Sequence, residues 1–103
     1  MFHALQEKFY EGNPLWREVM KSMRCVIDDH LVRLLDITGY RSYQALKDFE
    51  ESDFAEIEAF VRSGDLLERI ESRHLPQYLG QTKDPEKFKF VPGEKKVIRR
   101  VVQ

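Results

Sequence analysis

The side chains of this chain that could do chemistry are three histidines, one cysteine and eighteen Asp or Glu residues. Cys25 and His30 are five residues apart, whereas His3 and His74 stand alone in the sequence. Zinc ligands usually occur as close pairs of Cys or His. The spacing therefore predicts no metal site. It indicates a buried thiol, with histidines at the surface or at the edge of the core.

Nucleophilic and acid–base catalysis are not indicated either. A reactive cysteine needs a nearby base or cation, and Arg24 lies on a different helical face from Cys25. The five glycines are scattered, so there is no glycine-rich phosphate loop, and neither G-x-S-x-G nor H-E-x-x-H occurs. The carboxylates fall at predicted helix starts and on polar faces. We therefore expect no enzyme activity and no cofactor.

The charged residues form two segments of opposite sign. The net charge is −1, so no overall field draws the chain to DNA or to a membrane. Residues 48–58 contain six acids and no Lys or Arg, whereas residues 83–103 contain seven Lys or Arg and three acids. The alternative role for the acids is to stabilise helix N-termini. The predicted acidic partner-binding patch consists of Asp48, Glu50, Glu51, Asp53, Glu56 and Glu58.

The end of the chain predicts an amphipathic basic helix over residues 94–103, directly after Pro92 and Gly93. One side of this helix is apolar and carries Val97, Ile98, Val101 and Val102. The other side is a predicted partner-binding surface formed by Lys95, Lys96, Arg99 and Arg100. Such a helix can dock on its own core, on a partner protein or against phosphates, and the sequence leaves all three open.

Apolar residues that recur every three to four positions predict an all-α fold of five or six short helices around one core. Asn13 is a good N-cap, and Pro14 suits the first helical position. The apolar pattern that follows extends to Asp36. It fits either one long helix or two helices broken near Cys25. Residues 1–10 fit a short helix packed on the body.

Two further helices are predicted by their caps. Ser42 can cap a short helix that extends to Phe49. Asp53 and Glu56 have the spacing of a capping box, which predicts the start of the next helix, and Gly64 ends that helix. The acids in this region therefore have a structural alternative to partner binding.

Residues 65–93 are predicted to contain one more short helix followed by a loop. Asp65 can cap another short helix, and residues 76–93, which are rich in Pro and Gly, predict an ordered loop. Phe88, Phe90 and Val91 within this loop are expected to lie extended across the core. The loop would then lead into the C-terminal helix.

The helical periodicity also predicts which residues are buried. The expected core consists of Leu31, Leu34, Leu35, Leu46, Phe49, Phe54, Ile57, Phe60, Val61, Leu66, Leu67 and Ile70. Trp16 and Tyr10 are candidates for partner contact, because Trp and Tyr are enriched at binding hot spots. The alternative is that both rings close the rim of the core.

Length and composition limit the class of protein. A chain of 103 residues corresponds to one domain, and 42% hydrophobic with 34% charged residues is typical of a soluble globular protein. A single cysteine cannot form an internal disulfide and favours an intracellular, reducing compartment. No run approaches the ~20 apolar residues of a membrane span. The chain ends in mid-pattern, which predicts that it is a domain cut from a longer protein.

Residues 34–70, LLDITGYRSYQALKDFEESDFAEIEAFVRSGDLLERI, resemble sterile-alpha-motif-like and helix-hairpin-helix-like small helical domains. The shared pattern is an apolar helix, Gly-Tyr, a Ser-capped short helix with Ala-Leu, and an acid-capped helix with Ile-x-x-Phe. No G-x-G joins these helices, so the resemblance implies protein interaction rather than DNA contact through this element. Separately, IEAFVRSG and FKFVPGEKKVI are similar to N-terminal segments of animal proteins with zinc-finger or transposase-like regions downstream.

These resemblances and the charge pattern predict a protein-interaction or self-association domain. The parent would be an intracellular, more specifically nuclear, regulatory protein or scaffold acting on transcription or chromatin. If the acidic and basic patches lie on opposite sides, head-to-tail self-association follows. If they are adjacent, they neutralise each other, and the functional interpretation based on the two patches fails. The alternative function is nucleic-acid binding by the basic helix.

Overall fold

The structure is a computed structural model that describes residues 9–24, 26–80 and 82–102. The described residues form helices joined by turns and contain no strand, which confirms the predicted all-α class. Seven α-helices lie in these ranges, where five or six helices were expected. They are α1 (Pro14–Met23), α2 (Asp29–Ile37), α3 (Tyr43–Lys47), α4 (Glu51–Arg62), α5 (Asp65–Arg69), α6 (Leu75–Leu79) and α7 (Pro92–Val101). Three short 3₁₀ helices accompany them: η2 (Phe9–Gly12), η3 (Ser72–His74) and η4 (Pro85–Lys87).

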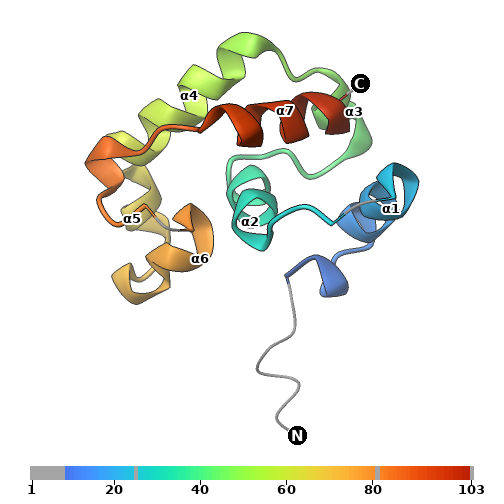
Figure 1. Cartoon of the computed structure of the whole chain (residues 1–103). Coiled ribbons are helices and arrows are strands. Elements are labelled where there is room, and N and C mark those ends of the chain that lie inside the picture. The colour runs from blue at the N-terminus through green and yellow to red at the C-terminus, as the bar shows by residue number, and fades with distance from the viewer. Residues whose placement is uncertain (1–8, 25, 81, 103) are drawn as a thin grey trace, which may run out of the picture.

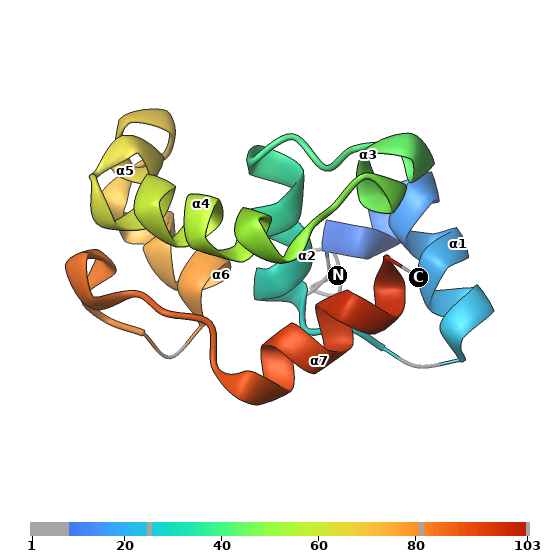
Figure 2. The ribbon, with the colours of Figure 1, turned by 90° about the horizontal axis from the view of Figure 1, so that it is seen from above.

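Helix α2 lies at the centre of the molecule, between α1 at one end and α5 and α6 at the other (Figures 1 and 2). Helices α4 and α7 lie across the same side of α2 (Figure 1). The buried side chains form one core cluster, and α7 contributes Ile98 to it with no exposed surface. Of the three docking modes open to the basic helix, the structure therefore shows docking on its own core.

The N-terminal apolar pattern forms two helices, α1 and α2. The Asn13 side chain accepts a hydrogen bond from the Trp16 N–H at 3.4 Å, and Pro14 occupies the first turn, as expected. Arg24 then adopts a left-handed conformation with φ of 57°, which ends α1. Cys25, where the break was predicted, lies outside the described residues, as do residues 1–8 of the predicted N-terminal helix.

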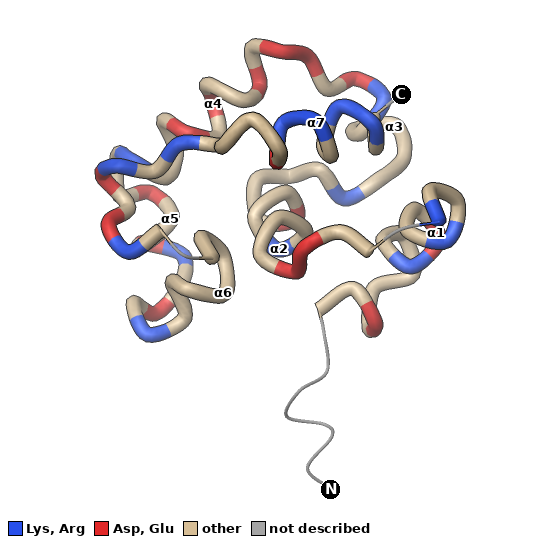
Figure 3. The backbone as a smooth tube through the Cα atoms, viewed as in Figure 1, with Lys and Arg blue, Asp and Glu red and all other residues tan. Residues whose placement is uncertain are grey.

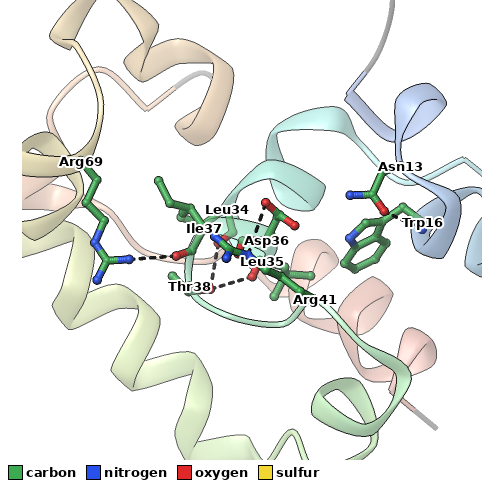
Figure 4. A network of polar contacts seen from close by, with 9 residues as sticks. All are labelled: Asn13, Trp16, Leu34, Leu35, Asp36, Ile37, Thr38, Arg41 and Arg69. Carbon is green, nitrogen blue, oxygen red and sulfur yellow. Dashed lines mark hydrogen bonds and ion pairs between the residues drawn. The ribbon is translucent and has the colours of Figure 1, made fainter.

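The carbonyl groups at the end of α2 are satisfied by side chains (Figure 4). The Thr38 hydroxyl donates to the Leu34 carbonyl at 2.8 Å, and Arg41 Nε donates to the Asp36 carbonyl at 2.8 Å. From α5, Arg69 donates to the Ile37 carbonyl at 3.3 Å. These side-chain bonds add to the backbone bonds that the Leu34 and Asp36 carbonyls accept from the Thr38 and Gly39 N–H groups, so the end of α2 is fixed before the turn to α3.

The caps of α3 and α4 differ in detail from the prediction. Ser42 caps α3 as expected, because its hydroxyl accepts from the Ala45 N–H at 3.1 Å. Helix α4 begins at Glu51, three residues earlier than expected, with the Asp53 carboxylate accepting from the Glu50 N–H at 2.8 Å. Asp53 is thus the third residue of the helix rather than its cap, and the predicted box with Glu56 is wrong.

Gly64 separates α4 from α5 with a φ of 93°, a left-handed conformation that favours glycine. Asp65 is therefore the first residue of α5 and not its cap.

The loop predicted at residues 76–93 is irregular only in part. Its first residues belong to α6, where Pro76 sits in the first turn and loses no intrahelical bond. Phe88 and Phe90 are buried as expected, but Val91 is 54% exposed because it is the N-cap of α7. Helix α7 begins at Pro92, two residues before the predicted start.

Three residues of the predicted core are not fully buried. Phe60 and Ile70 are half-buried, and Leu67 is exposed. They lie where α4 and α5 meet the surface, and the Arg69 guanidinium covers the Phe60 ring, 5.2 Å from its centre. The other nine predicted core residues are buried: Leu31, Leu34, Leu35, Leu46, Phe49, Phe54, Ile57, Val61 and Leu66.

Candidate functional site

The strongest candidate surface is a basic hollow at the start of α7. It is lined by Lys89, Phe90, Val91, Pro92, Lys95, Lys96 and Arg99. Figure 3 shows the run of Lys and Arg along α7 on one side of the molecule. In the described part of the chain, no carboxylate pairs with Lys89, Lys95 or Lys96. The hollow therefore presents three lysines, none paired with a described carboxylate, around the exposed side chain of Val91.

Lys89 was missed by the sequence prediction, although the sequence carries a signal for it. Phe88 and Phe90 alternate with Lys89 in an extended segment, and both rings are buried. Successive side chains of an extended chain point to opposite sides. The buried rings therefore direct the Lys89 side chain to the surface beside α7.

Two cations of the basic helix lie over an aromatic ring of α4. Lys95 Nζ and the Arg99 guanidinium are each 5.5 Å from the centre of the Phe54 ring. Phe54 belongs to a row of edge-on rings that also includes Phe49 and Phe90. A ring face attracts a cation electrostatically, so this row supports the basic hollow from below.

The acidic and basic segments contact each other within the chain. Arg99 donates to both carboxylate oxygens of Glu51, at 2.7 and 2.8 Å. These hydrogen bonds lower the pKa of Glu51 below its ordinary value, with the charges of Arg99 and Lys95 acting in the same direction. The acidic and basic segments are therefore adjacent and partly neutralise each other within one chain. This arrangement does not support head-to-tail self-association through two separate charged patches. Arg100 lies on the other side of α7, next to α1 and α3.

The predicted acidic patch does not form one surface. Glu58 is only 8% exposed, and its carboxylate accepts from the Phe90 N–H at 2.9 Å and from Arg62 at 3.2 Å. Its role as a partner-binding residue is therefore wrong, because both oxygens are occupied inside the fold. Asp48 accepts from Gln44 at 3.0 Å. Glu50 and Glu56 are exposed.

Asp53 faces the protein rather than a partner. As the third residue of α4 it accepts from the Glu50 N–H, and its charge, together with that of Glu56, acts on Tyr40. Burial is the main cause that raises the pKa of Tyr40 to about 12, and these two carboxylates add to it. Asp53 therefore serves the local structure.

The two aromatic contact candidates belong to the body of the protein. Trp16 has no exposed surface, so it is a core residue and its predicted contact with a partner is wrong. Trp16, Val19, Met20 and Met23 follow the spacing of one helical face, which places the ring inside. Tyr10 is half-buried and packs against the core cluster, which agrees with the alternative that it closes the rim.

A second candidate site is a cavity of about 780 Å³ between α2, α6 and α7, which contains the pair His30 and Glu94. His30 Nε2 lies 2.9 Å from one Glu94 oxygen, and the other oxygen accepts from the Val91 N–H at 3.0 Å. A Cβ at Gly80 would lie 3.1 Å from the His30 ring, so α6 packs tightly on it. With both oxygens occupied, Glu94 joins α2 to α7 instead of offering a free base.

The pair should make stability depend on pH. The hydrogen bond to Glu94 is the main cause that raises the pKa of His30 above 6.5; burial opposes the rise, and the charges of Asp28 and Asp29 support it. The stability that charged His30 contributes is therefore complete below pH 6.5 and is lost as pH rises through the folded pKa. We expect a lower urea midpoint at about pH 8.5 than at about pH 5.5, and a smaller difference for His30→Gln.

Glu94 makes the stability fall at low pH, as His30 does at high pH. Burial raises its pKa, but the hydrogen bonds from His30 and the Val91 N–H outweigh burial and leave the pKa below 4.5. Its contribution is therefore present above pH 4.5 and is lost as pH falls through the folded pKa. An equal pH dependence in the parent and in His30→Gln would show that the pair does not fasten α7.

In the described ranges, no three His, Cys, Asp or Glu side chains gather as metal ligands would, and no helix has the length and apolar character needed to cross a membrane. The chain matches no protein-family model, no curated protein and no solved structure. The resemblance of residues 34–70 to sterile-alpha-motif-like domains therefore stays a prediction. The case for a function depends on the geometry of this chain.

Proposed function

We propose that the chain is a protein-interaction domain of a larger intracellular, nuclear regulatory protein, and that the basic hollow at the start of α7 is its contact surface. The observation that carries this proposal is that the exposed side chain of Val91 lies among three lysines for which the described part of the chain offers no carboxylate partner. A partner that presents carboxylates and an apolar group would satisfy both features. The domain acts by binding and carries out no reaction.

The composition of the hollow favours protein over nucleic acid. Phosphate groups would be attracted by the charges of Lys89, Lys95 and Lys96, but they make no favourable contact with an exposed valine. The basic surface is also narrow, because Glu51 borders it through its bond to Arg99. Complementary charges at such a surface would speed encounter and fix the orientation of the partner.

Reversing the charge of the hollow should abolish partner binding without unfolding the domain. Lys89, Lys95 and Lys96 would be replaced together by Glu, and Arg17, Arg73 and Lys83 would be replaced by Glu in a control with the same change of net charge. The parent and the control should enrich the same proteins from a nuclear extract. The amount of these proteins recovered with the reversed chain should be lower by roughly tenfold or more. Circular dichroism would check that both variants keep their helices.

Two further measurements decide between kinds of partner. Light scattering across concentration shows whether the partner is a second copy of the chain. Anisotropy of a fluorescent DNA duplex tests the nucleic-acid alternative, for which binding should fall steeply with salt. Equal enrichment by the parent and the reversed chain contradicts the proposal, and salt-sensitive duplex binding lost on reversal replaces it with nucleic-acid binding.

A further inference from the structure

The C-terminal end of α7 lies next to α1 and α3 (Figures 1 and 2), and the side chains of these three helices line a cleft on the other side of α7 from the basic hollow. We call it the α1–α7 cleft. It has a volume of about 210 Å³ and is lined by Val19, Ser22, Met23, Tyr43, Leu46, Lys47, Arg100, Val101 and Val102. Most of these side chains are apolar, and the cleft is separate from the basic hollow.

The floor of the cleft is apolar and only partly covered. Val19 and Leu46 are buried beneath it, whereas Met23, Val101 and Val102 are half-buried and open to it. A cavity of about 150 Å³ lined by aliphatic side chains can hold benzene, so this cleft has room for one Leu, Met or Phe side chain. Methionine adapts its shape to such a group.

The rim adds an aromatic side chain and two cations. Tyr43 is 55% exposed at the mouth of the cleft, and tyrosines in such positions are frequent binding hot spots. Lys47 and Arg100 are exposed, and no carboxylate of the described residues pairs with either. None of the described Asp or Glu residues lines the cleft, and the nearby Asp48 accepts from Gln44 instead.

We propose that the α1–α7 cleft binds an acidic segment of a partner protein that inserts one bulky apolar side chain between α1 and α7. Carboxylates on either side of this anchor pair with Lys47 and Arg100, while Tyr43 covers it. The inference goes beyond the proposed function, because it assigns a second contact surface that shares no lining residue with the basic hollow. Phosphate is a poorer occupant, since it would leave the apolar floor uncovered.

The test uses defined peptides and the complete chain. An acidic helical peptide with one central Leu is titrated into ¹⁵N-labelled protein, beside the same peptide with Ala in place of Leu and a version with Lys in place of every acid. We expect saturable shifts of the amide signals of Met23, Tyr43 and Val101 with the Leu peptide. Affinity should fall at least roughly tenfold for the Ala peptide and be lost for the Lys peptide.

Variants of the chain locate the contact. Tyr43→Ala should weaken binding of the Leu peptide roughly tenfold, and so should the double variant Lys47→Glu with Arg100→Glu. Reversal of Lys89, Lys95 and Lys96 should leave the affinity for this peptide within about twofold of the parent. Equal affinity for the Leu and Ala peptides, shifts that lie only around the basic hollow, or no binding of any peptide overturns the inference. Shifts at the hollow alone would still agree with the proposed function, which fails separately if reversal of the hollow leaves protein enrichment unchanged.

Discussion

Replacing Trp16 with Ala is expected to lower the free energy of unfolding by about 3–5 kcal/mol, because the substitution empties the space of the largest buried side chain. A domain of this size has a free energy of unfolding of only about 5–15 kcal/mol, so the variant should lose a large part of its stability. Urea unfolding followed by circular dichroism measures the change. A shift below about 1 kcal/mol would place the ring at the surface and restore its role as a contact residue.

Two further variants separate the causes of this loss. The Trp16 indole N–H has no hydrogen-bond partner in the part of the chain that the structure describes, so Trp16→Phe removes an unsatisfied donor while it keeps most of the ring. We expect a cost of only about 1–2 kcal/mol for this variant. Val26 is 72% exposed, and Val26→Ala should stay within about 0.5 kcal/mol of the parent.

The sequence predicted those parts of the fold that depend on local contacts. The caps at Asn13 and Ser42 are confirmed because each side chain bonds an N–H only three residues away. Pro76 was misread as the start of a loop, since proline is compatible with the first turn of a helix as well as with a loop. Asp53 was assigned to the wrong position because an acid fits both the cap and the third residue of a helix.

The site was less predictable, because it depends on contacts between distant segments. Glu51 and Arg99 are separated by 48 positions, and nothing local indicates that they meet. The basic side of α7 was identified, but its division into the hollow with Lys95 and Lys96 and the cleft with Arg100 required the positions of α1 and α3. Periodicity places a residue on a face and does not say what covers that face.

The burial of Glu58 could have been predicted from its position in the sequence, but its charge led to the prediction of a surface residue. It lies on the apolar face of α4 with Phe54, Ile57 and Val61, at helical spacings of three, four and seven residues. A carboxylate on such a face is buried only when hydrogen bonds satisfy it. Glu58 meets this condition through the Phe90 N–H and Arg62.

Replacing Glu58 with Ala is expected to lower the free energy of unfolding by about 2–4 kcal/mol, because the buried Phe90 N–H would lose its acceptor together with a charge-assisted bond. Arg62 would keep its bond to the Phe88 carbonyl at 2.8 Å, so the segment before α7 would be loosened rather than released. Glu56→Ala, on the exposed side of the same helix, is the matched control and should cost within about 0.5 kcal/mol.

Glu58→Gln distinguishes the hydrogen bond from the charge. Its side-chain oxygen can still accept from the Phe90 N–H, so we expect a loss of about 1 kcal/mol, well below that of the alanine variant. Amide hydrogen exchange should show Phe90 protected in the parent and in Glu58→Gln but exchanging much faster in Glu58→Ala, since a lost acceptor opens this segment before the whole domain unfolds. If Glu58→Ala is as stable as Glu56→Ala and Phe90 stays protected, Glu58 does not hold the extended segment on α4, and the carboxylate returns to the surface available for a partner.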